Sequence, residues 1–205
     1  MSSHNTSFMH RPLDMLFAIF FSLGLFPAII FASQVALSPD LRSLYIPQSL
    51  QTLLVSAVAS THDPLISMAL GNREMWVASI FTAELVLQAP FFLFAIVALS
   101  MNWHSWFRFP AIIYSVHVLT TMIPIYAELL WGRQEFIQAL EMSEAEVYGL
   151  RLQWAGIYSP FIIMPTILLI KWLFFYDPTG SAGQRLFALA PGSMAKANLH
   201  TKKSQ

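Results

Sequence analysis

Four long apolar stretches restrict what this sequence can fold into. They cover Met15 to Leu37, Met75 to Leu99, Phe109 to Trp131 and Trp154 to Tyr176. Each meets the requirement of roughly 20 mainly apolar residues for a helix that crosses the hydrocarbon core of a bilayer. Each is apolar around its circumference, and none shows the two-residue alternation of a membrane β-barrel strand. The sequence therefore predicts an all-α membrane protein, a four-transmembrane-helix bundle.

Composition supports this prediction and excludes several function classes. Hydrophobic residues make up 56% of the 205 positions and charged residues 11%, against about 25% charged residues in a soluble domain. The 11 basic and 11 acidic residues balance, so we expect no nucleic-acid partner. The absence of Cys excludes disulfides, thiol nucleophiles and Cys-ligated metals. There is also no His-Glu-x-x-His pattern and no phosphate-binding glycine loop, so we expect neither a metal nor a cofactor.

The rest of the chain divides around the spans. We expect a cytosolic N-terminus at residues 1–12, a transmembrane domain at 13–176 and a cytosolic tail at 177–205. Between the first two spans, the apolar run Leu50 to Ala59 is too short to cross and predicts an interfacial helix. A cleaved signal sequence is the alternative for the first stretch, but Asp14 precedes it and no small-x-small cleavage site follows.

Charge distribution and the C-terminus predict the topology. An even number of spans puts both termini on one side, and this side holds six of the basic residues in loops and tails against four on the other. The positive-inside rule then favours cytosolic termini. Lys202 and Lys203 stand at the fourth and third positions from the C-terminus, which matches the dilysine signal read by the retrieval coat of the endoplasmic reticulum (ER), a receptor-read address.

Glu84 is the clearest polar residue inside a predicted span. Ionisable groups at mid-membrane are costly and usually face a bundle interior or a cavity. Gln88 follows one turn later on the same face, and Pro90 next to it lacks the backbone donor of a regular helix. Glu84 could serve only as a hydrogen-bond donor between helices, but we favour a role in binding a ligand or moving a proton.

The third span carries a longer polar stripe. Tyr114, His117, Thr121, Pro124 and Glu128 follow one another in steps of three or four residues, which places them on one helix face. A single histidine is more often a packing residue, but a histidine within such a stripe indicates a cavity. Glu128 lies near the end of the span, where it can reach the interface.

The first and fourth spans add further polar groups and helix breaks. Tyr158 and Pro160 combine a phenol with a break in the fourth span. Ser22, Ser33 and Gln34 in the first span fit helix-packing hydrogen bonds as well as ligand contacts. All four spans contain proline, and such breaks favour a bundle with an internal pocket.

An apolar pocket with a carboxyl group, an imidazole and phenols has two chemical uses. It can bind an amphiphile with one polar end, for example through the hydroxyl of a sterol. Alternatively, Glu84 or His117 could protonate a double bond while a partner removes a proton elsewhere, which would make the protein an isomerase. The residues alone leave both uses open.

Three segments resemble the sigma-2 receptor family of EXPERA-domain proteins: Glu84 to Phe92, Pro110 to Thr121 and Ile157 to Phe161. Asp63-Pro64-Leu65 and the lysine-rich C-terminus also match, and the similarity runs from about Arg11 to Tyr176. The resemblance implies a four-helix ER protein, often a homodimer, that binds sterols and cationic amphiphiles in an intramembrane pocket. Related EXPERA proteins include a sterol Δ8–Δ7 isomerase, and a fungal relative is linked to delivery of mitochondrial precursors from the ER surface.

The resemblance implies six ligand-binding residues by motif, and the polar face of the second span adds Gln88 as a seventh. They are Glu84, Gln88, Asp63, Tyr114, His117, Thr121 and Tyr158. The family usually has an aspartate near the end of the first span, where this chain has Ala32-Ser33-Gln34. We therefore expect a non-enzymatic ER protein that binds a sterol or another lipophilic molecule and influences lipid trafficking, with membrane lipid, the retrieval coat and a second copy of the chain as further partners. A sterol isomerase and a factor assisting precursor delivery are the alternatives.

Overall fold

The computed structural model describes residues 8–71, 74–132 and 142–176, and all regular structure among them is helical. The elements in chain order are η1 (Phe8–His10), α1 (Pro12–Ala36), α2 (Pro39–Tyr45), α3 (Gln48–Thr61), α4 (Pro64–Leu70), α5 (Met75–Ala83), η2 (Glu84–Gln88), α6 (Ala89–Ser100), α7 (His104–Trp131), α9 (Glu144–Tyr158), α10 (Pro160–Ile170) and η3 (Lys171–Phe175). Here η1 is a 3₁₀-helix, whereas η2 and η3 are π-helical turns.

Four helical segments are long and apolar enough to cross a membrane: Pro12–Ala36, Met75–Ser100, His104–Trp131 and Glu144–Phe175. They confirm the predicted all-α fold class with four spans. The largest difference from the predicted bounds is at the fourth span, which begins at Glu144 instead of Trp154. A capping box causes the earlier start, because Ser143 Oγ accepts a hydrogen bond from the Glu146 N–H at 3.4 Å and Glu146 Oε2 accepts one from the Ser143 N–H at 2.8 Å.

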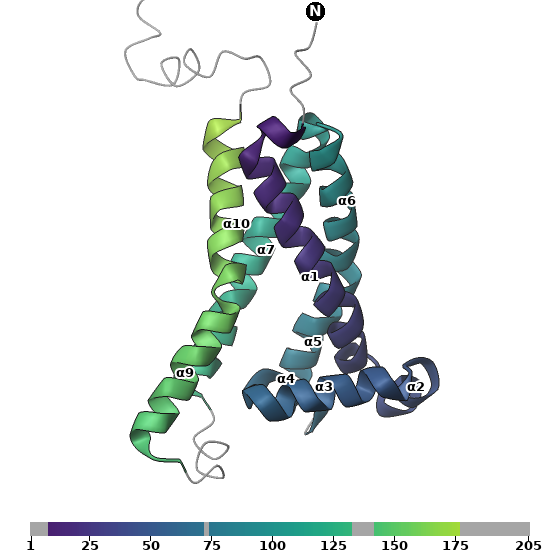
Figure 1. Cartoon of the computed structure of the whole chain (residues 1–205), viewed down its shortest axis with the longest axis vertical. Helices are drawn as coiled ribbons and strands as arrows, with labels where there is room; N and C mark the ends of the chain where they lie inside the picture. The colour runs from purple at the N-terminus through teal and green to yellow at the C-terminus, as the bar shows by residue number, and fades with distance from the viewer. Residues whose placement is uncertain (1–7, 72–73, 133–141, 177–205) are drawn as a thin grey trace, which may run out of the picture. The chain divides into compact units, whose positions relative to one another are not determined.

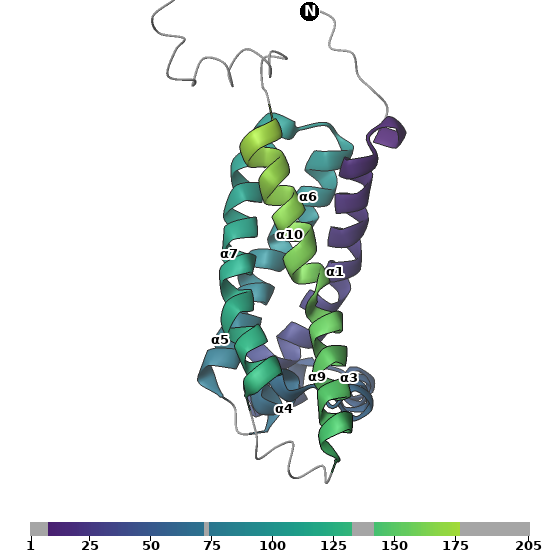
Figure 2. The ribbon, with the colours of Figure 1, turned by 90° about the vertical axis from the view of Figure 1, so that its left-hand side faces the viewer.

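The chain divides into two compact units, residues 1–169 and 170–205. In the first unit α1 packs against α5 and α6, and α6 packs against α7 (Figures 1 and 2). The central contact is close because Gly24 has no side chain: a Cβ atom there would lie 3.2 Å from the Phe92 ring. In the second unit, the Lys171 ammonium lies 5.0 Å from the centre of the Trp172 ring.

Helix α3 lies across one end of the first unit (Figure 1), at the position where the sequence predicts a short interfacial helix. Gln34 at the end of α1 fastens it, because its side-chain amide donates to Leu50 O at 3.1 Å and to Ile30 O at 2.8 Å. Trp154 of α9 donates from its indole N–H to Thr61 O at 2.9 Å. Of the two roles that the sequence leaves open for Gln34, helix packing and ligand contact, the structure shows helix packing.

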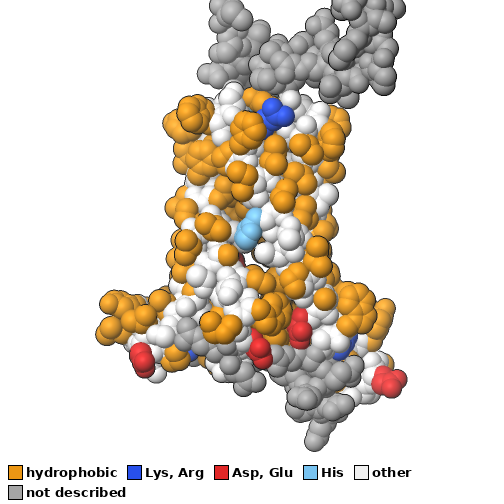
Figure 3. Space-filling model, turned by 180° about the vertical axis from the view of Figure 1, so that it is seen from behind, with side chains coloured by type: hydrophobic (Ala, Val, Ile, Leu, Met, Phe, Trp, Pro, Cys, Tyr) orange, Lys and Arg blue, Asp and Glu red, His pale blue; other side chains and the backbone are white. Residues whose placement is uncertain are grey.

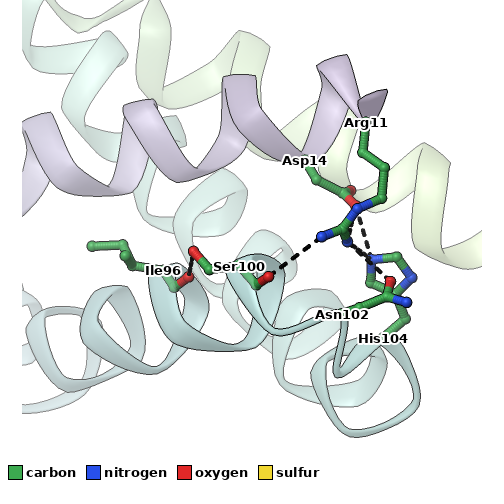
Figure 4. A network of polar contacts seen from close by, with 6 residues as sticks. All are labelled: Arg11, Asp14, Ile96, Ser100, Asn102 and His104. Atoms are coloured by element: carbon green, nitrogen blue, oxygen red, sulfur yellow. Dashed lines mark hydrogen bonds and ion pairs between the residues drawn. The ribbon is translucent and has the colours of Figure 1, made fainter. Parts of the chain in front are cut away.

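A polar cluster joins the start of α1 to the loop between α6 and α7 (Figure 4). Arg11 Nη1 lies 2.9 Å from Asp14 Oδ2 and also 2.9 Å from Asn102 Oδ1. These acceptors use both hydrogens of Nη1, so the Nε2 atom of His104, 2.8 Å from Asp14 Oδ2, carries the proton of that hydrogen bond. Asn102 adopts the left-handed conformation (φ 60°) that turns the loop toward Arg11. Asp14 is thus a buried structural carboxyl group.

The outer surface of the spans is apolar, as contact with lipid requires. Figure 3 shows hydrophobic side chains over the middle of one face, with acidic side chains at one end and a histidine within the apolar band. Ile113 and Ile123 of α7 and Val86 of η2 are strongly exposed apolar residues of the spans. In water such a surface would mark an aggregation or binding site, but on a spanning helix it is the lipid-facing side.

We predict that Asp14→Ala destabilises the protein by about 1–3 kcal/mol, because it leaves the part-buried Arg11 and His104 without their shared acceptor. Thermal unfolding in mild detergent measures the effect. Asp40→Ala on exposed α2 is the control and should change stability by less than about 0.5 kcal/mol. Equal melting temperatures for the two variants would refute a stabilising role for the cluster.

Candidate functional site: a polar-tipped cavity between the spans

The second span changes its winding at Glu84. Between Glu84 and Gln88 the helix is a π turn, in which the Ala89 N–H bonds to Glu84 O, five residues back. Pro90 directly follows and has no N–H to give to Val86 O. The wider turn accommodates this missing donor without unwinding the helix, and π turns occur frequently at functional sites. The sequence predicted a break near Pro90 but not its π-helical form.

A cavity opens beside this turn. Its empty volume, counting the mouth, is about 530 Å³. Nine of its thirteen lining residues are apolar, among them Trp76, Phe81 and Phe161, and the other four are Glu84, Gln88, Thr121 and Tyr158. Residues from α4, α5, η2, α7, α9 and α10 therefore meet there. The structure brings together four of the seven residues that the sequence assigned to ligand binding.

Glu84 and Gln88 are the unsatisfied polar groups of the cavity. Within the described part of the chain, neither side chain makes a hydrogen bond to a protein group. Gln88 is 7% exposed as a whole residue and Glu84 is half-buried, and the polar atoms of neither are among the fully buried ones without a partner, because both side chains line the cavity. A ligand with a hydroxyl or another small polar group could supply the missing hydrogen bonds.

Thr121 and Tyr158 have partners already. Thr121 Oγ1 donates to Val118 O in its own helix at 2.9 Å, and the Tyr158 hydroxyl donates to Asp63 Oδ2 at 2.8 Å. Each oxygen still has a lone pair with which to accept a hydrogen bond. In the cavity these two hydroxyl groups are therefore acceptors.

Asp63 lies beside the cavity without lining it. It caps the N-terminus of α4, because its Oδ1 accepts from the Leu65 and Ile66 N–H groups at 2.9 and 3.2 Å. Its other oxygen holds the Tyr158 hydroxyl. Burial raises the pKa of Asp63, and the hydrogen bonds from Tyr158, Ile66 and Leu65 oppose part of this rise. The geometry makes Asp63 a positioning residue for Tyr158.

Tyr114 and His117 also lie outside the cavity lining. The Tyr114 ring stacks on Phe91 at 4.5 Å and meets Phe21 and Phe92 edge-on at 5.5 and 5.6 Å. Its hydroxyl and the His117 Nε2 atom are buried, and neither has a hydrogen-bond partner in the part of the chain that the structure describes. The stripe on α7 is therefore divided: Thr121 lines the cavity, whereas Tyr114, two turns earlier, belongs to an aromatic cluster.

In the described residues, no three His, Asp or Glu side chains gather closely enough to hold a metal ion.

Comparison with known proteins gives the family. The EXPERA family, the expanded EBP superfamily, matches residues 37–172. The chain is 34% identical over 160 residues to sigma intracellular receptor 2 of Homo sapiens and of Macaca fascicularis, which covers 78% of this chain and 86% of each relative. It is 32% identical over 167 residues to that of Xenopus tropicalis, which covers 80% of this chain and 90% of the relative.

The chain belongs to the EXPERA family. All thirteen residues that line the cavity fall inside the matched range of 37–172. Helix α1 lies before this range, and none of its residues lines the cavity. The suspected relationship to the sigma-2 receptor family is confirmed.

Sequence reasoning missed most of the apolar lining and the cluster around Asp14. The signal for the lining was present, since Trp76 and Ile80 precede Glu84 and Gln88 in steps of four residues and share their helix face. Asp14 meets its partner His104 across 90 positions of sequence, and Arg11 meets Asn102 across 91, so no local sequence pattern indicates either contact.

We predict that Asp63 makes stability depend on pH. Because burial raises its folded-state pKa, its stabilising effect is complete below the unfolded pKa of about 4 and is lost as the pH rises through the folded value. Asp63→Asn, which stays neutral, should therefore remove the part of the fall in melting temperature that wild type shows above about pH 4. Asp40→Asn is the control and should retain the wild-type profile. An unchanged profile in Asp63→Asn would contradict the assignment.

Proposed function

We propose that this EXPERA protein is a non-enzymatic receptor that binds a sterol or a related amphiphile in the cavity between its spans and influences lipid trafficking. The observation that carries the proposal is an apolar cavity in which Glu84 and Gln88 lack hydrogen-bond partners among the described residues. The relatives are named sigma intracellular receptor 2, and a receptor role in them supports ligand binding here.

The lining suits a ligand with one polar end. A rigid hydrocarbon body would cover the nine apolar residues, with Trp76, Phe81 and Phe161 offering the largest faces. The polar end would reach Glu84, which accepts a hydrogen bond, and Gln88, which can donate one. A hydroxyl group meets both needs with a single oxygen, which favours a sterol over a purely hydrocarbon ligand. Asp63 would keep the Tyr158 ring in place against the ligand.

The proposal includes a location in the ER membrane with both termini in the cytosol. Two features of the sequence support this location: the distribution of Lys and Arg between the two sides, and the pair Lys202 and Lys203. This pair lies outside the described residues. The retrieval coat would read this pair. The end of the bundle that carries α2, α3 and α4 would then face the lumen, and a homodimer remains part of the proposal.

We predict that a photo-crosslinkable sterol labels wild-type protein and that Glu84→Leu reduces the labelling by about two- to tenfold, because it removes one hydrogen bond of about 0.5–1.5 kcal/mol. Glu144→Leu is the matched control, since Glu144 is exposed at the start of α9, and it should label like wild type. Equal labelling of both variants would remove Glu84 from the site.

A sterol isomerase is the second candidate, and the buried His117 Nε2 atom without a partner is the observation in its favour. Isomerisation needs one group that protonates the substrate and another that removes a proton. Glu84 lines the cavity but His117 does not, so the arrangement supports binding better than proton transfer. A role in precursor delivery stays a prediction.

We predict that the wild-type chain does not restore growth to a strain lacking sterol Δ8–Δ7 isomerase, although it reaches the membrane at normal levels. The physical reason is that His117, the imidazole required by the isomerase hypothesis, is not among the residues that line the cavity with Glu84. Growth that depends on both Glu84 and His117 would overturn the receptor proposal in favour of the enzyme. A known isomerase expressed from the same vector is the positive control.

A further inference from the structure

Helix α2 carries an exposed apolar face at the end of the bundle. Leu41, Leu44 and Tyr45 follow one another at the spacing that places side chains on one side of a helix, and they are 43%, 71% and 68% exposed. Ser43 lies on the opposite side of the helix, and Asp40, four residues before Leu44, stands at the edge of this face. This face is therefore an apolar surface that no other described part of the chain covers.

The length of α1 places α2 at the membrane boundary. Its 25 residues span about 37 Å, against about 30 Å for the hydrocarbon core. The cluster of Arg11 and Asp14 keeps the first turn at the opposite interface. Because α2 begins three residues after the end of α1, it lies near the depth at which lipid headgroups meet acyl chains.

The neighbouring helix α3 shows that this segment lies flat. It crosses the end of the bundle (Figure 1) and buries Leu54 against it. Its opposite side presents Ser49, Thr52 and Ser56, and the whole helix has no charged residue. An uncharged helix with one apolar and one hydroxyl-rich side is suited to the plane of an interface.

The lipid-facing surface of the spans continues toward α2. A shallow, mainly apolar groove runs along α5 and η2 to Ala36, the last residue of α1. Met75, Val86 and Leu87 on this groove are strongly exposed. The apolar face of α2 therefore begins where a surface already in contact with lipid ends.

We propose that α2 is an interfacial anchor whose face of Leu41, Leu44 and Tyr45 inserts into the bilayer leaflet at this end of the bundle. The partner is the boundary between lipid headgroups and acyl chains. Leucine supplies apolar area, and tyrosine prefers this depth because its ring is apolar and its hydroxyl is polar. Through the hydrogen bonds of Gln34 and Trp154 to α3, the anchor would also fix the segment that carries Asp63.

The natural absence of cysteine allows a direct test. Leu44→Cys and Ser43→Cys each receive an environment-sensitive fluorophore, and each full-length protein is reconstituted at one copy per phosphatidylcholine nanodisc. Ser43 is the matched control because it is also exposed but points away from Leu41 and Tyr45. Lipids with a spin label at the upper acyl chain should quench the probe at position 44 several-fold more than that at 43, and aqueous iodide should show the opposite order. Tyr45→Cys provides a second reporter.

Equal iodide quenching at positions 43, 44 and 45 would overturn the proposal, because it would place the whole helix in water. Protection of position 44 from iodide without quenching by spin-labelled lipid would also overturn it, since protein would then cover the face. Protection that appears only when two copies share a nanodisc would identify a second copy of the chain as the occupant. None of these results depends on sterol binding.

Discussion

The lack of water in the bilayer core is the constraint on which the site depends. Every backbone donor and acceptor in a span must find a partner within the protein, yet Pro90 cannot donate to the carbonyl one turn before it. The chain responds with the π turn at Glu84–Gln88, which widens the helix where the cavity lies. The carboxyl and amide groups at the two ends of this turn both line the cavity. The missing N–H of Pro90 therefore accounts both for the π turn of the backbone and for the position of the two polar side chains in the cavity.

A second set of interactions stabilises the part of the protein around the cavity by connecting α3 and α4 to the spans. Asp63 ties the start of α4 to Tyr158, Trp154 ties α9 to the end of α3, and Gln34 ties α1 to the same helix. Each hydrogen bond joins a residue of a span to a residue of the segment between the first two spans. Because α9 ends at Tyr158 and α10 begins at Pro160, these bonds fix the fourth span just before its own break. The short helices between the first two spans are therefore part of the site's framework.

Much of the fold follows from the sequence because hydrophobicity over 20 residues is a strong local signal. The spans, the crossing helix and the polar face of Glu84 and Gln88 are of this kind. The division of the α7 stripe is different, since Tyr114 and Thr121 have the same periodicity and only the neighbouring helices decide which of them meets the cavity. Asp63 shows the same limit: its cap is readable from Asp63-Pro64, but its bond to Tyr158 joins positions 95 residues apart.

Two carboxyl groups in the spans show how a structural acid differs from a ligand-binding candidate. Asp14 is 2% exposed and has a guanidinium and an imidazole as partners, so its charge is compensated within the fold. Glu84 has no hydrogen-bond partner among the described residues and faces a space that the protein leaves open. A chain selected only for stability would replace such a group with an apolar residue, because an unsatisfied polar group in a low-dielectric environment is costly. Its position beside an empty volume supports the proposal that a ligand with a polar end binds there.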